Sequence, residues 1–207
     1  MNSTQPIVRV VDDDVSFLSA ISRLLRAGGY AVQTFTSAAE FLERLDPRTP
    51  GCVLADLRMP GQSGLDLQAL LAKADDPMPV IFLTGHGDIP TTVRAMRYGA
   101  VDFLTKPVRK QNLFDALQRA LARAAEVREQ RTHLRALRAR FDRLTPRERE
   151  VLAHVVSGKL NKQIAAELDT SERTIKAHRA GIMKKLTVQS VAELVRLAQE
   201  LGIQPVP

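Results

Sequence analysis

The stretch IVRVVDDD, residues 7–14, joins a short apolar run to three consecutive aspartates and sets the pattern for the first half of the chain. Similar runs rich in Val, Ile, Leu and Phe recur at residues 31–35, 52–55, 80–83 and 101–104. Short, nearly continuous apolar runs are typical of parallel strands that are buried on both faces. Because connections between parallel strands are right-handed, five such runs separated by helices predict a doubly wound five-stranded parallel sheet of the α/β class.

Helix-length segments separate the apolar runs. They are residues 15–27, 38–45, 65–73 and 90–98, with another that begins near Gln111. Boundary signals agree with this division, because Ser37 and Glu40 form a capping-box pattern at one helix start and Gly99 supplies a left-handed stop at a helix end.

The composition excludes several classes of protein. The chain has 207 residues, of which 44% are hydrophobic and 26% are charged, so it can build folded cores and is not a disordered chain. Its one cysteine, Cys52, has no CxxC partner or clustered histidines, which excludes a disulfide framework and a zinc site. The N-terminus has no secretory pattern, and no window approaches the roughly 18 apolar residues of a membrane span. We therefore expect a cytoplasmic protein with no membrane partner.

The charge is divided unevenly along the chain. Residues 1–120 hold 13 basic and 13 acidic side chains, whereas residues 121–207 hold 17 basic and 10 acidic ones, which accounts for the whole net charge of +7. A domain-sized basic segment behind a neutral one indicates a nucleic-acid-binding module. The alternative is a basic tail that serves only solubility.

One long helix is predicted over residues 113–144, where no Gly or Pro occurs. Steps of four and three residues along it give an apolar seam that Arg131 and Arg138 interrupt, and its apolar members include Leu117, Ala124, Val127 and Leu134. Two interpretations stay open. The segment is either a linker helix whose apolar side leans on the two domains, or a dimerising stalk that carries a signal between them.

A second domain is expected to begin at Thr145, because Thr145, Pro146 and Glu148 form a capping box with proline at the first helical position. Three or four short helices and no strand follow, at residues 146–157, 162–168, 172–186 and 191–201. The second and third of these, joined by a short turn inside a basic segment, are typical of a helix-turn-helix. The predicted division is a first domain over 1–120, a linker helix over 121–144 and a DNA-binding domain over 145–207.

Polar side chains follow the predicted strands at the points where the strands end. In chain order they are Asp12, Asp13 and Asp14 after the first strand, Asp56 after the third, Thr84 at the end of the fourth and Lys106 after the fifth. Because the carboxyl ends of parallel strands share one edge of the sheet, these side chains should converge. Clustered carboxylates favour a small hard cation, which indicates Mg²⁺, and a carboxylate beside Mg²⁺, a lysine and a hydroxyl is equipped to attack phosphorus. The alternative is an N-terminal helix cap and an exposed lysine.

The predicted helix 172–186 has two different sides. Since successive residues turn by about 100 degrees, Ile175, Ile182 and Leu186 share one stripe. The other side holds Arg173, Lys176, Ala177, Ala180 and Lys184. The alanines leave that side smooth enough to enter a major groove, where the cations can reach base edges or phosphates. A merely solvated charged face does not explain small residues flanked by cations.

The last predicted helix carries an apolar stripe of its own, formed by Val191, Leu194, Ala198 and Leu201. This stripe either completes the core of the domain or pairs two subunits.

Several segments resemble a known family. The segments VVDDD, LADLRMPGQSG, FLTGHGD and VDFLTKP are similar to the receiver domain of two-component response regulators, and residues 144–186, which begin LTPREREVL, resemble the LuxR-type DNA-binding domain. Their order and spacing resemble the FixJ/NarL family, closer to FixJ in the TGHGD and DFLTKP stretches. The resemblance implies a flavodoxin-like α/β receiver, followed by a linker helix and an all-α helix-turn-helix domain.

The resemblance implies roles for residues at the strand ends. Asp56 is then the phosphate acceptor, and Asp12 and Asp13 hold Mg²⁺ together with Asp56 and the backbone carbonyl of Arg58. Thr84 and Lys106 engage the phosphoryl group.

Further roles are implied for residues beside and beyond this site. Phe103 corresponds to the aromatic switch, and Lys106-Pro107 to the cis peptide bond of the family. In the DNA-binding domain, Lys176, Ala177 and Ala180 match the base-reading positions, and Thr174 and Lys185 are expected to contact phosphates. His86 is interpreted as a solvated loop residue, with an influence on the access of water to the acyl phosphate as the alternative.

We therefore expect a non-enzymatic, phosphorylation-controlled transcription regulator. A sensor histidine kinase phosphorylates Asp56, and the receiver changes the face formed by residues 90–98 and the fifth strand. The DNA-binding domain is then released or dimerised, and the protein binds double-stranded promoter DNA. The alternative function is a phosphohydrolase of the haloacid dehalogenase type with Asp12 as the nucleophile, which leaves the basic domain unused.

Overall fold

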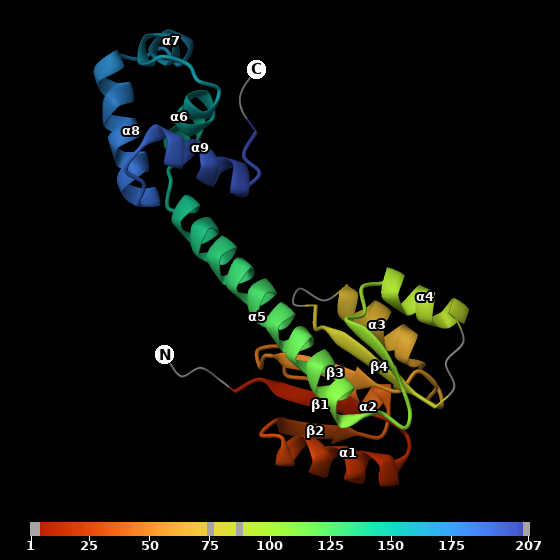
Figure 1. Cartoon of the computed structure of the whole chain (residues 1–207). Helices are drawn as coiled ribbons and strands as arrows, with labels where there is room; N and C mark the ends of the chain where they lie inside the picture. The colour runs from red at the N-terminus through yellow and green to blue at the C-terminus, as the bar shows by residue number, and fades with distance from the viewer. Residues whose placement is uncertain (1–4, 74–76, 86–88, 205–207) are drawn as a thin grey trace. The chain divides into compact units, whose positions relative to one another are not determined.

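The computed structural model describes residues 5–73, 77–85 and 89–204, and the chain forms two compact units (Figure 1). The first unit is Met1–Arg128 and the second is Glu129–Pro207.

The first unit is built on a five-stranded parallel sheet with the strand order β2-β1-β3-β4-β5. The strands are β1 (Ile7–Val11), β2 (Ala31–Phe35), β3 (Gly51–Ala55), β4 (Val80–Thr84) and β5 (Asp102–Thr105). The order reverses between β1 and β3, as in a doubly wound sheet, so the fold class predicted from the sequence is confirmed. In β3 and β4 every residue is buried, which explains why these runs are continuous rather than alternating in polarity.

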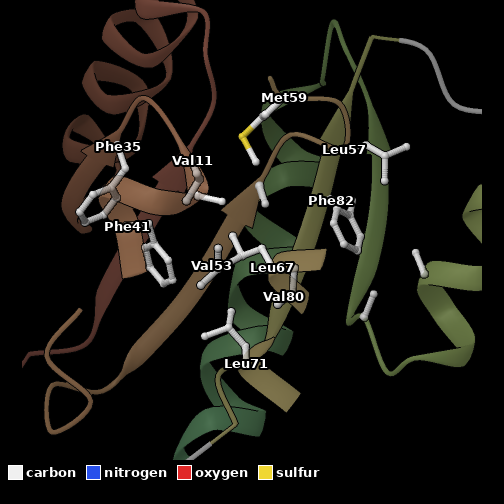
Figure 2. Close-up of a cluster of buried hydrophobic side chains, with 14 residues drawn as sticks. Val11, Phe35, Phe41, Val53, Leu57, Met59, Leu67, Leu71, Val80 and Phe82 are labelled. Atoms are coloured by element: carbon white, nitrogen blue, oxygen red, sulfur yellow. The ribbon is translucent and has the colours of Figure 1, made fainter. Parts of the chain in front are cut away.

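Helices cover both faces of this sheet. They are α1 (Val15–Ala27), α2 (Ala38–Glu43), α3 (Gly64–Ala72), α4 (Ile89–Arg97) and the first part of α5 (Lys110–Phe141). Alternate strand residues point to opposite faces, and two apolar cores result. Val11, Val53 and Phe82 pack with residues of α2, α3 and α4 in the core shown in Figure 2, whereas Val10 and Leu54 pack with α1 and α5 on the other face.

Element boundaries differ from the sequence-based ones by one to three residues, the largest difference being in the long helix, which runs over Lys110–Phe141 rather than 113–144. The third helix begins at Gly64 rather than at residue 65, because Ser63 and Asp66 form a reciprocal capping box there. The fifth strand begins at Asp102, and the second helix ends at Glu43.

The long helix predicted from the sequence is confirmed as α5, a single helix of 32 residues. Leu113 and Leu117 are completely buried in the core of the first unit, and Leu137 is buried in the core of the second. Leu134, which the predicted seam included, is 37% exposed, whereas Leu137, which it omitted, is 6% exposed. Leu137 thus packs in the second core together with the seam residue Phe141, and pairing of two helices through the seam stays a prediction.

The described residues of the second unit form four further helices: α6 (Pro146–Val156), α7 (Asn161–Glu167), α8 (Glu172–Leu186) and α9 (Val191–Glu200). As predicted, the Thr145 side chain and Glu148 form a capping box at the start of α6, with Pro146 in the first turn. Leu194 of α9 is buried in the same core as α6 and α8, Leu201 packs against that core, and Ala198 is buried. Val191, the first residue of the stripe, is 41% exposed. The stripe therefore contributes to the core of the domain, and its pairing of two subunits stays a prediction.

Candidate functional site

Three charged side chains meet at the carboxyl edge of the sheet. Val11 and Ala55 are paired across β1 and β3, so Asp12 and Asp56, the next residue of each strand, leave the sheet side by side. Both aspartates are buried, with exposed fractions of 2% and 7%. Lys106, just after β5, places its Nζ 2.5 Å from Asp12 Oδ2 and 3.0 Å from Asp56 Oδ1. The lysine therefore bridges two carboxylates that would otherwise repel each other in a poorly solvated place.

Burial and pairing act in opposite directions on these groups. Burial raises the pKa of Asp12 above its ordinary value, although the hydrogen bond and charge of Lys106 oppose that change. For Lys106, burial acts to lower the pKa, but the hydrogen bonds to Asp12 and Asp56 outweigh it and the pKa is raised. The ammonium is thus held in its charged form, as a group that neutralises phosphoryl oxygens requires.

The three consecutive aspartates take three different positions. Asp12 points into the site, and its Oδ1 accepts a hydrogen bond from the backbone N–H of Asp14 at 3.0 Å. Asp14 is the N-cap of α1, since its Oδ1 accepts from Ser16 N and Phe17 N. The helix-cap interpretation is therefore right for Asp14 and wrong for Asp12.

Asp13 is exposed, and among the residues that the structure describes no three Asp, Glu, His or Cys side chains gather as a metal site. The arrangement that is present consists of two buried carboxylates. One of them, Asp56, accepts a hydrogen bond from Arg58 N at 2.7 Å through its Oδ2. The assignment of Asp13 as a metal ligand stays a prediction.

Thr84 lies at the same edge, and Phe103 lies two residues before the end of β5. Thr84 is the last residue of β4 and is 1% exposed, and its backbone carbonyl accepts a hydrogen bond from Lys106 N at 2.8 Å. Phe103 is half-buried in β5, and the centroid of its ring lies 6.1 Å from that of Phe82. The predicted cis peptide bond between Lys106 and Pro107 is confirmed. His86 lies outside the described residues.

The predicted DNA-reading helix is α8, and it has the two sides expected. Ile175, Ile182 and Leu186 are completely buried in the core of the second unit. The residues assigned to the opposite side are all exposed: Arg173, Lys176, Ala177, Ala180 and Lys184. Thr174, assigned to a phosphate, is half-buried, and its hydroxyl lies 2.9 Å from Ser171 Oγ at the helix start.

Lys185 has a buried partner that its assignment as a phosphate contact did not include. Its Nζ donates to Glu148 Oε2 at 2.6 Å, and Glu148 is only 6% exposed. The same carboxylate accepts a hydrogen bond from Thr145 N at 2.7 Å. Glu148, which completes the capping box at the start of α6, thus also binds Lys185 of α8. The capping pattern revealed Glu148 in the sequence, but nothing local indicated its partner 37 residues away.

A second polar link was not predicted from the sequence. Arg179 Nη1 donates to Asn161 Oδ1 at 2.8 Å, which joins α8 to the first turn of α7. The two helices of the helix-turn-helix are therefore tied by a hydrogen bond as well as by apolar packing.

Comparison with known proteins assigns both units. Residues 8–118 match the family described as response regulator receiver domain, and residues 142–198 match that described as bacterial regulatory proteins, luxR family. The chain belongs to the response regulator family. As a member of it, this response regulator carries a receiver domain and a LuxR-type DNA-binding domain in two-component transcription regulation.

Relatives match this response regulator over nearly its full length. It is 45% identical to the response regulator protein TmoT of Ectopseudomonas mendocina, over 97% of this chain and 91% of that protein. It is 38% identical to the transcriptional regulatory protein FixJ of Bradyrhizobium diazoefficiens, over 97% of this chain and 98% of that one. The solved structure of the response regulator StyR is 47% identical, with a TM-score of 0.84, 95% of this chain and 99% of that chain being covered.

The family assignment leaves the phosphohydrolase alternative without support. That alternative gave the basic second unit no role, whereas this unit matches a DNA-binding family and lies within the region that is shared with the relatives. Of the helices described, none is long and apolar enough to span a membrane.

Proposed function

We propose that a sensor histidine kinase phosphorylates this response regulator on Asp56, and that phosphorylation makes it a dimer that binds promoter DNA. The observation that carries the proposal is the position of Asp56, a carboxylate that is 7% exposed and lies 3.0 Å from the Lys106 ammonium. A nucleophile in this place has a fixed cation beside the oxygens on which charge develops during phosphoryl transfer.

Asp12 is the less suitable nucleophile of the pair. Its Oδ2 already makes the shorter contact with Lys106, and it is the less accessible of the two aspartates, 2% exposed against 7% for Asp56. We therefore assign Asp12 to charge balance and metal binding. Thr84, buried at the end of β4, is proposed to hydrogen-bond the transferred group through its hydroxyl.

Magnesium is proposed as the metal of this site. Two buried carboxylates at one sheet edge form a hard oxygen donor set, and Mg²⁺ commonly binds proteins through one or two carboxylates while keeping several waters. Asp12, Asp56 and the carbonyl of Arg58 fit this requirement, with Asp13 as a further ligand. When bound, the metal would supply positive charge in addition to that of Lys106, and both charges would help to neutralise the phosphoryl oxygens.

Dimerisation is proposed to use an exposed apolar surface of the receiver domain. On α4 the residues Ile89, Val93 and Met96 are 80%, 44% and 44% exposed and recur at the spacing of one helix face, so they form an apolar patch of the kind that marks an interaction site. We propose that the state of Phe103 in the neighbouring strand β5 controls whether this face pairs with a second copy. A two-fold dimer then gains both half-sites of a near-palindromic operator at once.

DNA binding is proposed for the exposed side of α8. Lys176, Ala177 and Ala180 are placed to meet base edges, and Arg173, Thr174, Lys184 and Lys185 to contact the backbone. The support is the exposure of the basic side chains opposite a fully buried stripe.

One experiment tests the proposal. The full chain is treated with acetyl phosphate and Mg²⁺, the labelled residue is located by mass spectrometry, and the mass is followed by sedimentation. We expect label on Asp56 and a shift from monomer to dimer, both absent in Asp56→Asn. Label that survives in Asp56→Asn, or a tight dimer without phosphodonor, contradicts the proposal.

A further inference from the structure

The Lys106 ammonium has a third neighbour besides the two aspartates. Its Nζ lies 4.1 Å from the centroid of the Phe17 ring. This distance is well inside the range over which a cation is attracted to the face of an aromatic ring. The Lys106 side chain is only 22% exposed, so the ring covers part of the ammonium that would otherwise face water.

The position of Phe17 is set by the same segment that supplies the carboxylates. Phe17 stands in the first turn of α1, and its backbone N–H donates to the N-cap Asp14 Oδ1 at 3.0 Å. The backbone N–H of Asp14 in turn donates to Asp12 Oδ1 at 3.0 Å. A short chain of hydrogen bonds therefore couples the place of the ring to the place of the buried carboxylate.

We propose that Phe17 is a positioning residue for phosphoryl transfer, acting by holding the Lys106 ammonium between Asp12 and Asp56. This inference rests on the proposed role of Asp56. Lysine has a flexible four-carbon stem and a compact charge, so its ammonium needs partners in more than one direction to stay in one place. A ring face attracts the cation but accepts no proton, and so it does not compete with the two carboxylates or with an incoming phosphoryl oxygen.

Ordinary core packing is the competing explanation, because Phe17 is half-buried beside the core formed by α1, α5 and the sheet. Phe17→Leu separates the two, since leucine keeps apolar bulk and loses the aromatic face. Phe17→Tyr keeps both. The chain also offers a matched control in Phe114, a half-buried aromatic at the same core whose ring lies 5.3 Å from the Nζ of Lys110, a lysine outside the site.

The test measures the initial rate of Asp56 phosphorylation by acetyl phosphate with Mg²⁺ in the full chain. We expect Phe17→Leu to be about three- to tenfold slower, the range that a lost cation–π contact implies. Phe17→Tyr and Phe114→Leu should react at the rate of the unaltered protein. In a Lys106→Met background, where no ammonium remains at the Phe17 ring, Phe17→Leu should cause no further change.

Several outcomes overturn the inference. They are an unchanged rate in Phe17→Leu, an equal loss in Phe114→Leu, a loss of the same size in Phe17→Tyr, and an undiminished effect of Phe17→Leu in the Lys106→Met background. Failure of the proposed function looks different, because the label then persists in Asp56→Asn.

A spectroscopic measurement covers the case in which Phe17→Leu does not fold. An ammonium stem above a ring face experiences the ring current, so the Lys106 Cε protons should resonate upfield of the other lysines in the unaltered protein and in Phe17→Tyr. The lysine signal that is missing from the spectrum of Lys106→Met is the signal of Lys106. A Lys106 resonance at the ordinary lysine position refutes the contact without any measurement of phosphorylation.

Discussion

The pair formed by Glu148 and Lys185 leads to an asymmetric prediction for the stability of the DNA-binding domain. The Glu148 side chain is 8% exposed, whereas the Lys185 side chain is 35% exposed. When one partner of an ion pair is removed, the other must be rehydrated or stay unpaired, and the cost depends on whether it can reach water. Glu148 cannot reach water easily, whereas Lys185 can.

The expected magnitudes follow from this difference in exposure. Lys185→Met keeps the apolar stem of the lysine but leaves the buried Glu148 carboxylate with Thr145 N as a remaining partner. We expect it to lower the free energy of unfolding by about 2–3 kcal/mol. This is somewhat less than for a fully buried ion pair, because Lys185 itself touches solvent. Glu148→Gln keeps an acceptor for Thr145 N and for Lys185, and should cost about 1 kcal/mol. Gly181 leaves the space for this group, since a Cβ there would lie 3.0 Å from Glu148 Oε1.

The pH dependence of the free energy of unfolding shows whether the charge of Glu148 stabilises the domain. Burial acts to raise the pKa of Glu148, but hydrogen bonds from Lys185 and Thr145 outweigh it and the pKa is lowered. A group whose pKa is lowered by folding contributes stability above its unfolded pKa and loses it as the pH falls through the folded value. The unaltered protein should therefore lose more stability than Glu148→Gln as the pH falls below the ordinary range of a glutamate.

The assay is urea unfolding of the full chain, followed through the transition of the second unit, at neutral pH and at a pH below the ordinary glutamate range. The reasoning is refuted if Glu148→Gln lowers the free energy of unfolding as much as Lys185→Met at neutral pH. It is also refuted if the difference in unfolding free energy between the unaltered protein and Glu148→Gln does not become smaller in acid.

Four further predictions concern other parts of the molecule. The Asp13→Ala variant should be phosphorylated weakly, and its phosphorylation should not respond to Mg²⁺. If the Mg²⁺ dependence of phosphorylation is the same as in the unaltered protein, Asp13 is not a metal ligand. Lys176→Ala should relax base preference and cost about 1–3 kcal/mol on specific DNA, and equal losses on specific and random DNA would mean that it contacts only the backbone. Leu137→Ala should destabilise the second unit by about 2–4 kcal/mol, against less than about 1 kcal/mol for the exposed Leu134→Ala, and similar melting shifts would contradict the assigned helix face. Gly64→Ala should impair phosphorylation of Asp56, because a Cβ there would lie 2.3 Å from the Asp56 carbonyl oxygen, and a normal rate would show that the loop yields.

The sequence by itself determined the class of fold and the edge of the sheet where the chemistry lies. Five apolar runs at strand length predict a buried parallel sheet, and a polar residue that ends such a run must stand at its carboxyl edge. Both properties are local and periodic, so a single chain suffices to recognise them. The side of α8 that carries Lys176 follows in the same way, because the helical repeat alone separates it from Ile175 and Ile182.

Only the tertiary structure decided which partner each charged group takes. Sequence proximity does not distinguish Asp12, which points into the site, from Asp14, which caps α1, since that depends on the direction in which the chain leaves β1. Lys106 and Phe17 are 89 positions apart in the sequence, and Lys185 and Glu148 are 37 apart, so no periodic pattern connects them. Such contacts arise when packed elements bring distant side chains within a few ångströms. The burial of the surrounding atoms then decides how strongly they interact.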